Sequence, residues 1–273
     1  MHSGMCCEQR PRGIGRRRVL VLLVGAAGSV TVACTSEQLA QTGELLAISP
    51  QQAEALGLDT WTRIRQEQEV SPDAALQQRL QSIGQRLVAA NDFGRQNWEF
   101  VVFRNEQINA FALPGGKVGF YEGIFKVMDN DAHVATVMGH EIGHVTEQHG
   151  AQRIGIAQAS ELGLQAVSTA LEAGNIAYAN QIAGLLGAGV QYGVILPYSR
   201  GQELEADQVG VLYMARAGYD PRQSISFWQN MSQAKGGGQP PEFLSTHPSD
   251  QQRIAGLEAL MPQAVPVFEQ ARS

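Results

Sequence analysis

The sequence has no cysteine after Cys34, because Cys6, Cys7 and Cys34 are the only three in its 273 residues. The body of the protein therefore has no thiols to pair or to hold a thiolate metal cluster. A metal ion bound there would need nitrogen and oxygen ligands, which are more typical of catalytic than of structural zinc sites. The cellular compartment stays open, since a cysteine-free body neither requires nor excludes an oxidising environment.

The chain also lacks an excess of basic charge. Its formal net charge is −6, and residues 1–34 hold five Arg and one Glu, which leaves 15 basic and 25 acidic residues in the rest. A domain this acidic does not present the positive surface that nucleic acids require, so we expect no nucleic-acid partner. With 44% hydrophobic residues, the chain is long enough to form one domain with a substantial core.

The N-terminal apolar run, Val19–Ala33, is shorter than the roughly 20 residues of a transmembrane helix. It follows the basic Arg16–Arg18 and precedes Cys34, an order that is typical of an export signal. We therefore assign residues 1–34 to a signal peptide and the polar residues 35–48 to a tether.

Thr31–Cys34 resembles a bacterial lipobox, in which the cysteine is lipidated and becomes the mature N-terminus. Thr31 departs from the usual pattern, which has an aliphatic residue at that position. Thr35, where Asp would indicate retention at the inner membrane, favours sorting to the outer membrane. These features predict an exported, periplasmic protein anchored to the outer membrane by a lipid on Cys34, and a conventional cleavage site near Cys34 is the alternative.

Residues 49–273 are predicted to fold as one α+β domain that is mostly helical. Ser49-Pro50 predicts a helix start, with Gly57 as the stop. A second Ser-Pro pair, Ser71-Pro72, leads into an apolar stripe at helical spacing that ends near Asn91. After it, β-branched and aromatic residues predict three strands, which we expect to form a small antiparallel sheet: residues 98–103, 109–113 and 118–121.

The chain is organised around the stretch His140–His144, which reads His-Glu-Ile-Gly-His. On a helix, residues four apart share a face, so the two histidines can hold one metal ion between them, and Glu141 can reach a water on that ion. This spacing is the signature of zinc metallopeptidases, and it predicts Zn²⁺ as the cofactor. Gly143 indicates close approach by another segment. His149 lies off the metal-facing side and is expected to be solvated.

A third metal ligand is predicted on a second helix, where Glu203 and Asp207 lie four residues apart on one face. Glu203 can bind the ion, while Asp207 can accept the outer N–H of His140 and so fix the tautomer of that ring. Glu205 points away from this pair by helical geometry and is expected to be a surface group.

Four blocks of the chain, in the same order, resemble peptidase family M48, which includes HtpX-like and BepA-like zinc metalloproteases. The blocks are Asn109–Gly116, His140–His144, Ser199–Asp207 and Thr246–Pro248 with Arg253-Ile254. The resemblance covers about residues 70–260 and implies a zincin-like metallopeptidase domain. The chain looks most like the short, exported, lipoprotein-type members.

The resemblance also bears on the roles of the remaining site residues. Glu141 would act as the general base toward a water that the zinc ion activates. His247 would stabilise the tetrahedral oxyanion, or bind zinc as a fourth ligand that keeps the enzyme latent, or be structural. Arg253 would stabilise the oxyanion or pair with a carboxylate such as Asp207.

The predicted function is a zinc endopeptidase for misfolded or unassembled cell-envelope proteins, with the outer-membrane assembly machinery as a partner. The alternatives are a chaperone-like assembly factor with latent protease activity and a metal-dependent hydrolase of other substrates. The strand at residues 109–113 either offers an edge on which an unfolded substrate adds or lies inside the sheet. Residues 173–199 carry no charged side chain, and we expect packed helices or a cover beside the site in preference to a transmembrane hairpin.

Overall fold

The computed structural model describes residues 48–93, 96–155, 198–234, 243–244, 247 and 251–273. The predicted signal peptide with Cys34, the tether up to residue 47 and residues 173–197 lie outside these ranges. Every helix that the structure describes is too short or too polar to span a lipid bilayer. The helices are α2 (Pro50–Glu67), α3 (Ala74–Ala90), α4 (Asp131–Thr146), α7 (Arg200–Arg216), α8 (Gln223–Gln233) and α10 (Gln251–Arg272), with a short 3-10 helix η1 (Glu122–Val127); the strands are β1 (Glu99–Phe103), β2 (Ala110–Leu113) and β3 (Lys117–Tyr121).

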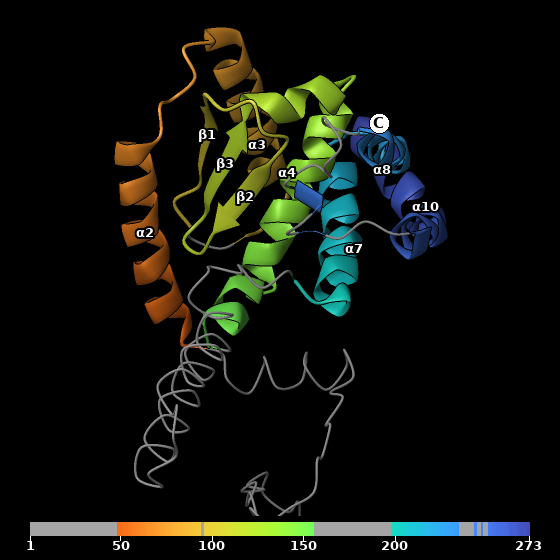
Figure 1. Ribbon diagram of the computed structural model, residues 1–273. Coiled ribbons are helices and arrows are strands. Elements are labelled where there is room, and N and C mark those ends of the chain that lie inside the picture. The colour runs from red at the N-terminus through yellow and green to blue at the C-terminus, as the bar shows by residue number, and fades with distance from the viewer. Residues whose placement is uncertain (1–47, 94–95, 156–197, 235–242, 245–246, 248–250) are drawn as a thin grey trace, which may run out of the picture. The chain divides into compact units, whose positions relative to one another are not determined.

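Helix α4 is central to this arrangement (Figure 1). The sheet and α3 pack on one side of it, and α7 packs on the other, with α10 and α8 beyond. All thirteen residues from His133 to Val145 are buried. Because α4 carries the metal-binding motif, the candidate site lies inside the domain and not on an exposed helix.

Polar side chains at their N-termini determine where three of the helices begin. Ser49 and Ser199 each form a capping box with the Gln three residues later. α2 therefore starts where the sequence predicts, and α7 starts directly after Ser199. Asn130 caps α4, and its side chain accepts a hydrogen bond from the backbone N–H of His133.

The prediction that α2 ends at Gly57 was wrong, and the helix continues to Glu67. A Cβ atom on Gly57 would lie 2.1 Å from the carbonyl oxygen of Pro114, so this position needs glycine for the close approach of α2 to the turn after β2. The helix also buries Trp61 against Phe103 and Tyr121 of the sheet. That packing outweighs the cost of about 1 kcal/mol of a glycine inside a helix.

The three strands form one sheet in the order β1-β3-β2. β2 pairs antiparallel with β3, with Ala110 opposite Phe120, as predicted. β1, however, pairs parallel with β3, with Glu99 opposite Lys117, so the sheet is mixed and the prediction of a wholly antiparallel sheet was wrong for this pair. Because β3 takes the central position, β1 and β2 are not neighbours. The short turn at residues 114–116 joins β2 directly to β3, and a turn of this kind can connect only antiparallel strands.

Helices α4 and α7 cross at glycines. A Cβ atom on Gly139 would lie 2.6 Å from the carbonyl oxygen of Gly210, and one on Gly143 would lie 3.0 Å from the carbonyl oxygen of Ala206. This is the close approach that Gly143 predicted. The short distance between the two backbones lets side chains on α4 and α7 meet at one point.

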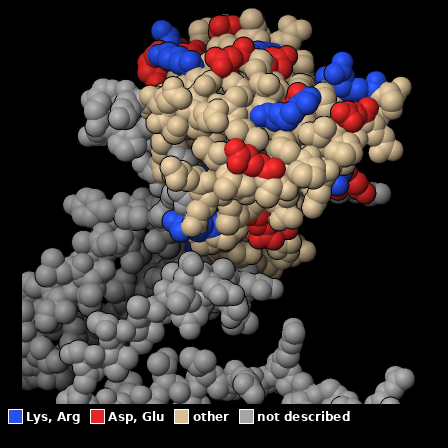
Figure 2. All heavy atoms as spheres, turned by 90° about the vertical axis from the view of Figure 1, so that its right-hand side faces the viewer, with Lys and Arg blue, Asp and Glu red and all other residues tan. Residues whose placement is uncertain are grey.

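Most charged side chains of the described residues lie on the surface. On the face that Figure 2 shows, Lys and Arg side chains are interspersed with Asp and Glu side chains. On this face the described residues therefore form no continuous basic stripe.

Candidate active site

Four buried side chains bring their ligand atoms within 4.8 Å of one another: those of His140, His144, Glu203 and His247. The Nε2 atoms of His140 and His144 are 3.0 Å apart. Oε2 of Glu203 lies 3.5 Å from Nε2 of His140, and Oε1 of Glu203 lies 3.3 Å from Nε2 of His144. Ligand atoms that bind a tetrahedral zinc ion at 2.0–2.1 Å lie about 3.3 Å from each other. Two imidazoles and a carboxylate at this spacing fit a zinc ion.

Asp207 and Arg253 surround this cluster. Oδ1 of Asp207 is 2.9 Å from Nδ1 of His140, so that nitrogen can donate its proton outward and leave Nε2 free. Nε of Arg253 donates to Asp207 at 2.6 Å, and its Nη1 donates to Glu203 at 2.5 Å. The guanidinium carbon lies 3.8 Å from the ring centroid of Trp228. Of the two roles predicted for Arg253, these contacts match the pairing with carboxylates.

Glu141 lies beside the cluster and is 1% exposed. Its Oε1 atom has no hydrogen-bond partner among the described residues, although Nε2 of His247 lies 3.4 Å from it. A buried acceptor without a partner costs about 1–3 kcal/mol, so such groups need a functional explanation. This oxygen is available to accept a proton from a water at the cluster.

His247 reaches the cluster from a separate segment. The backbone N–H of Phe243 donates to the carbonyl of Ile108 at 3.0 Å, and the N–H of His247 donates to the carbonyl of Phe243 at 2.8 Å. The rings of Phe243 and His247 stack with centroids 4.6 Å apart. Nδ1 of His247 lies 3.2 Å from Nε2 of His140 and 3.0 Å from Oε1 of Glu203, at a fourth corner of the cluster.

His149 is buried, at 1% exposure, so the prediction that it is solvated was wrong. Helix α4 ends at Thr146, and Gln148 has a φ of 59°, so the chain turns back and helical spacing no longer applies. Nδ1 of His149 lies 2.9 Å from Nδ1 of His144, and its Nε2 lies 3.2 Å from Oε2 of Glu205. The side chain of Glu205 is 54% exposed, which agrees with a surface position, but it also contacts the site.

Tyr198 is a site residue that the sequence analysis missed. Its ring stacks on that of His144, with centroids 3.7 Å apart and an interplanar angle of 15°. The guanidinium carbon of Arg153 lies 4.1 Å from the centroid of Tyr198. The available signal was its position directly before Ser199, the cap of the helix that carries Glu203.

Burial is the largest influence on the protonation of the site. It lowers the pKa of His144 well below its usual range, against an opposing bond from Glu203. Burial raises the pKa of Glu203 and Asp207. At Glu203 this effect is outweighed by His247, Arg253 and the two cluster histidines of α4 together, and at Asp207 by Arg253 and His140 together, so the pKa of both carboxyls is lowered. Neutral imidazoles and ionised carboxylates are the forms that bind divalent metals.

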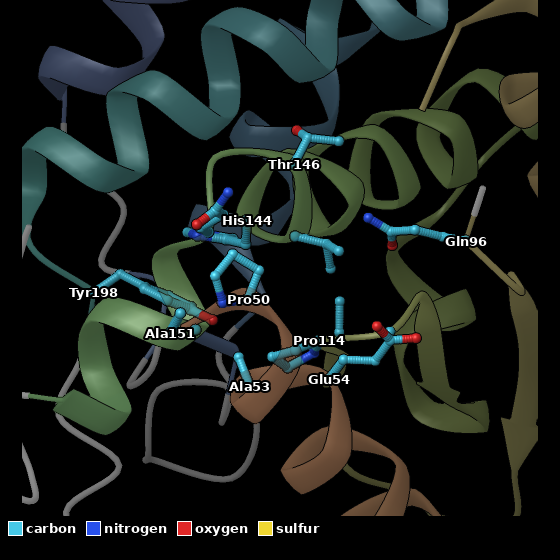
Figure 3. Close-up of a pocket in the computed structure, with 14 residues that line it drawn as sticks. Pro50, Ala53, Glu54, Gln96, Pro114, His144, Thr146, Ala151 and Tyr198 are labelled. Carbon is cyan, nitrogen blue, oxygen red and sulfur yellow. The ribbon is translucent and has the colours of Figure 1, made fainter. Parts of the chain in front are cut away.

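A cavity of about 160 Å³ opens beside the cluster (Figure 3). His144 and Tyr198 lie on one side of it, and Glu54 of α2 and Pro114 of the turn after β2 lie on the other. Among the described residues that line the cavity, Glu54 carries the one formal charge. The cavity is therefore bordered by both the cluster and the end of β2.

The model of peptidase family M48 matches residues 74–261. This chain belongs to that family. The resemblance seen in the sequence is thereby confirmed, as is the zincin-like α+β fold class apart from the pairing of β1. The match includes the sheet, α4, α7, His247 and Arg253, while α2 precedes it.

Several curated relatives are similar over most of the matched region. The mitochondrial metalloendopeptidase OMA1 of Schizosaccharomyces pombe is 34% identical over 180 residues, which cover 66% of this chain and 51% of the relative. The beta-barrel assembly-enhancing protease of Escherichia coli K12 is 34% identical over 207 residues, which cover 73% of this chain and 42% of the relative. The protein of the same name from Yersinia pestis is 35% identical over 191 residues, which cover 67% of this chain and 38% of the relative. The chain thus spans about half or less of the length of these relatives.

Proposed function

We propose that this protein is a zinc-dependent endopeptidase that cleaves misfolded or unassembled proteins of the cell envelope. The observation that carries the proposal is the buried Oε1 atom of Glu141, which has no hydrogen-bond partner among the described residues, beside the cluster of His140, His144 and Glu203. Membership of a peptidase family supports the reaction class. The name of the bacterial relatives, beta-barrel assembly-enhancing protease, supports envelope substrates and a link to the outer-membrane assembly machinery.

The proposed mechanism assigns a separate task to each residue. His140, His144 and Glu203 would hold the zinc ion, which would supply a Lewis acid to polarise the scissile carbonyl and acidify a water molecule. Glu141 accepts the proton of that water at its buried Oε1 atom and passes it to the leaving amine. Asp207 holds the ring of His140 with Nε2 facing inward. No covalent intermediate with the protein is required.

For His247 we propose the role of a fourth ligand that keeps the enzyme latent. Its Nδ1 atom lies at the corner of the cluster that a catalytic zinc site leaves open for water or substrate. Catalysis then requires His247 to move away. The alternative, in which His247 donates a hydrogen bond to the oxyanion, makes the residue necessary for turnover.

We further propose that an unfolded substrate adds as a strand to β2. Among the described residues β2 lies at the edge of the sheet, since β3 is its one neighbour in the strand order, and it packs beside α4. Main-chain hydrogen bonds to such an edge give affinity without strict sequence preference. One substrate side chain would enter the cavity beside His144. This mode of binding requires a chain that can adopt an extended conformation, so folded domains should be poor substrates.

The proposed location is the periplasm, with a lipid on Cys34 holding the protein at the outer membrane. The basic and apolar N-terminal sequence supports export, and the bacterial relatives support an envelope location. Mass spectrometry of the mature N-terminus tests this part alone. An acylated N-terminal Cys34 is expected, and an unmodified N-terminus at another residue would contradict it.

Digestion of casein by the purified full-length protein tests the reaction. We expect cleavage that a chelator stops and added zinc restores, and we expect none from Glu141→Gln, which keeps the size of the side chain. A tightly folded domain should be cleaved much more slowly than casein under the same conditions. Casein cleavage that is insensitive to the chelator or independent of Glu141 would contradict the proposal. The proposal would also be contradicted if neither the wild type nor the His247→Ala variant cleaved casein.

The second candidate is a chaperone-like assembly factor with latent protease activity. The position of His247 at the fourth corner of the cluster favours it, because a closed site fits a protein whose proteolysis is held back. It predicts that Glu141→Gln still supports outer-membrane protein assembly in cells that lack the wild-type protein. Failure of that variant to support assembly would favour the endopeptidase.

A further inference from the structure

Each of the two cluster histidines on α4 has a partner on its outer ring nitrogen. For His140 the partner is the carboxylate of Asp207. For His144 it is the ring of His149, with the two Nδ1 atoms 2.9 Å apart, and His149 in turn contacts Glu205 at 3.2 Å. We propose that His149 and Glu205 are positioning residues that fix the tautomer of His144 and so set the metal affinity of the site. This inference rests on the proposed function, because it requires a metal ion at Nε2 of His144.

The positions of the protons follow from the contacts. Two ring nitrogens at hydrogen-bond distance share one proton, so one Nδ1 atom donates and the other accepts. Metal binding needs the lone pair of Nε2, so a neutral His144 must carry its proton on Nδ1. His149 must then accept at Nδ1 and carry its own proton on Nε2. The carboxylate of Glu205 is only an acceptor, and it faces that N–H.

The opposite arrangement is disfavoured by Glu205. If His149 carried its proton on Nδ1, its Nε2 lone pair would face Oε2 of Glu205, and two acceptors would oppose each other at 3.2 Å. His149 would then donate to Nδ1 of His144, which would place the proton of His144 on Nε2, toward Glu203. That proton would block the metal. The charge of Glu205 therefore selects the arrangement in which His144 can bind.

A second set of contacts explains why the hydrogen bond between His144 and His149 is needed. Tyr198 stacks on His144 and fixes the plane of its ring, and Arg153 lies over the outer face of Tyr198. Stacking alone does not decide which edge of the ring faces the cluster, because a half-turn of the ring leaves its plane unchanged. The hydrogen bond to His149 decides it.

Zinc affinity of the full-length protein, measured by competition with a chromophoric chelator, tests the proposal. His149→Phe keeps a ring but removes both nitrogens, and it should weaken zinc binding about 10- to 100-fold. His149→Asn places an acceptor close to the position of Nδ1 and should recover part of that loss. Glu205→Ala should weaken binding, whereas Glu205→Gln, whose amide oxygen can accept the same bond, should stay closer to the wild type.

Glu258→Ala is the matched control, because it removes the same charge from an exposed position on α10. It should leave zinc affinity unchanged. Urea unfolding with chelator present shows whether His149→Phe folds. Glu205→Ala changes an exposed side chain, so it tests the contacts from Glu205 through His149 to His144 without altering the interior. Wild-type affinity in both His149→Phe and Glu205→Ala would overturn this inference and leave the proposed function standing. If the wild-type protein bound no zinc, both would fall.

Discussion

Replacement of Arg253 by Met should destabilise the protein strongly, because it leaves two buried carboxylates without their cation. Arg253 is 1% exposed, and it bonds Asp207 at 2.5 and 2.6 Å and Glu203 at 2.5 Å. Breaking a buried ion pair by removing one partner costs 3–5 kcal/mol, and the lost contact with the Trp228 ring adds about 1 kcal/mol. The expected loss of about 4–6 kcal/mol is a large share of the 5–15 kcal/mol that stabilises a typical domain.

The stability that Arg253→Met loses relative to the wild type should become smaller at acid pH. In the wild type the pKa of Asp207 is lowered in the folded state, because Arg253 and His140 together outweigh the effect of burial. A carboxyl of this kind contributes stability that is complete above its unfolded pKa of about 4 and is lost as the pH falls through the folded pKa. Without Arg253, burial raises the pKa of both carboxyls, so protonation favours the folded variant. The difference in unfolding free energy between the two proteins should therefore narrow below about pH 4.

Urea unfolding at pH 7 and at about pH 3, followed by tryptophan fluorescence with chelator present, measures both effects. Arg65→Met is the control, because Arg65 pairs with Glu99 at 3.0 Å where the two side chains are 39% and 41% exposed. Surface pairs of this kind contribute about 0–1 kcal/mol. If Arg253→Met lost no more stability than Arg65→Met, the reasoning about the buried network would be refuted.

Three further substitutions test other parts of the structure. His247→Ala should increase the rate of casein cleavage by opening the fourth corner of the cluster, and a large fall in that rate would favour the oxyanion role instead. Asp207→Asn should weaken zinc binding about 10- to 100-fold in a chelator competition, because the bond that orients His140 loses its charge; unchanged affinity would exclude this role. Gly57→Ala should cost about 1–3 kcal/mol in urea unfolding, because its Cβ would meet the carbonyl of Pro114 at 2.1 Å, and an unaltered midpoint would contradict the docking of α2.

Much of the candidate site could be predicted because helical spacing is a local property of the sequence. His140 with His144, and Glu203 with Asp207, each lie four residues apart, so each pair shares a face wherever its helix packs. What remained open was which residues outside these helices would join them. The roles of His247 and Arg253 depend on where the final segment and α10 lie, and no local pattern records that position.

The errors have the same origin. A strand pattern identifies a strand but not the direction of its partner, so the parallel pairing of β1 with β3 was not foreseen. Gly57 resembles a helix stop because its contact, Pro114, is distant in the sequence. His149 was placed by extending the helix, whereas the positive φ of Gln148 turns the chain back toward His144.

Zinc-edge anomalous diffraction from crystals of the zinc-loaded protein tests the central claim most directly, because it locates the metal relative to the protein. We predict one peak that lies about 2.0–2.2 Å from Nε2 of His140, from Nε2 of His144 and from a carboxylate oxygen of Glu203, with Glu141 beside it and not among the ligands. A peak at any other group of residues, or no peak from zinc-loaded protein, would contradict the assignment of this cluster as the metal centre.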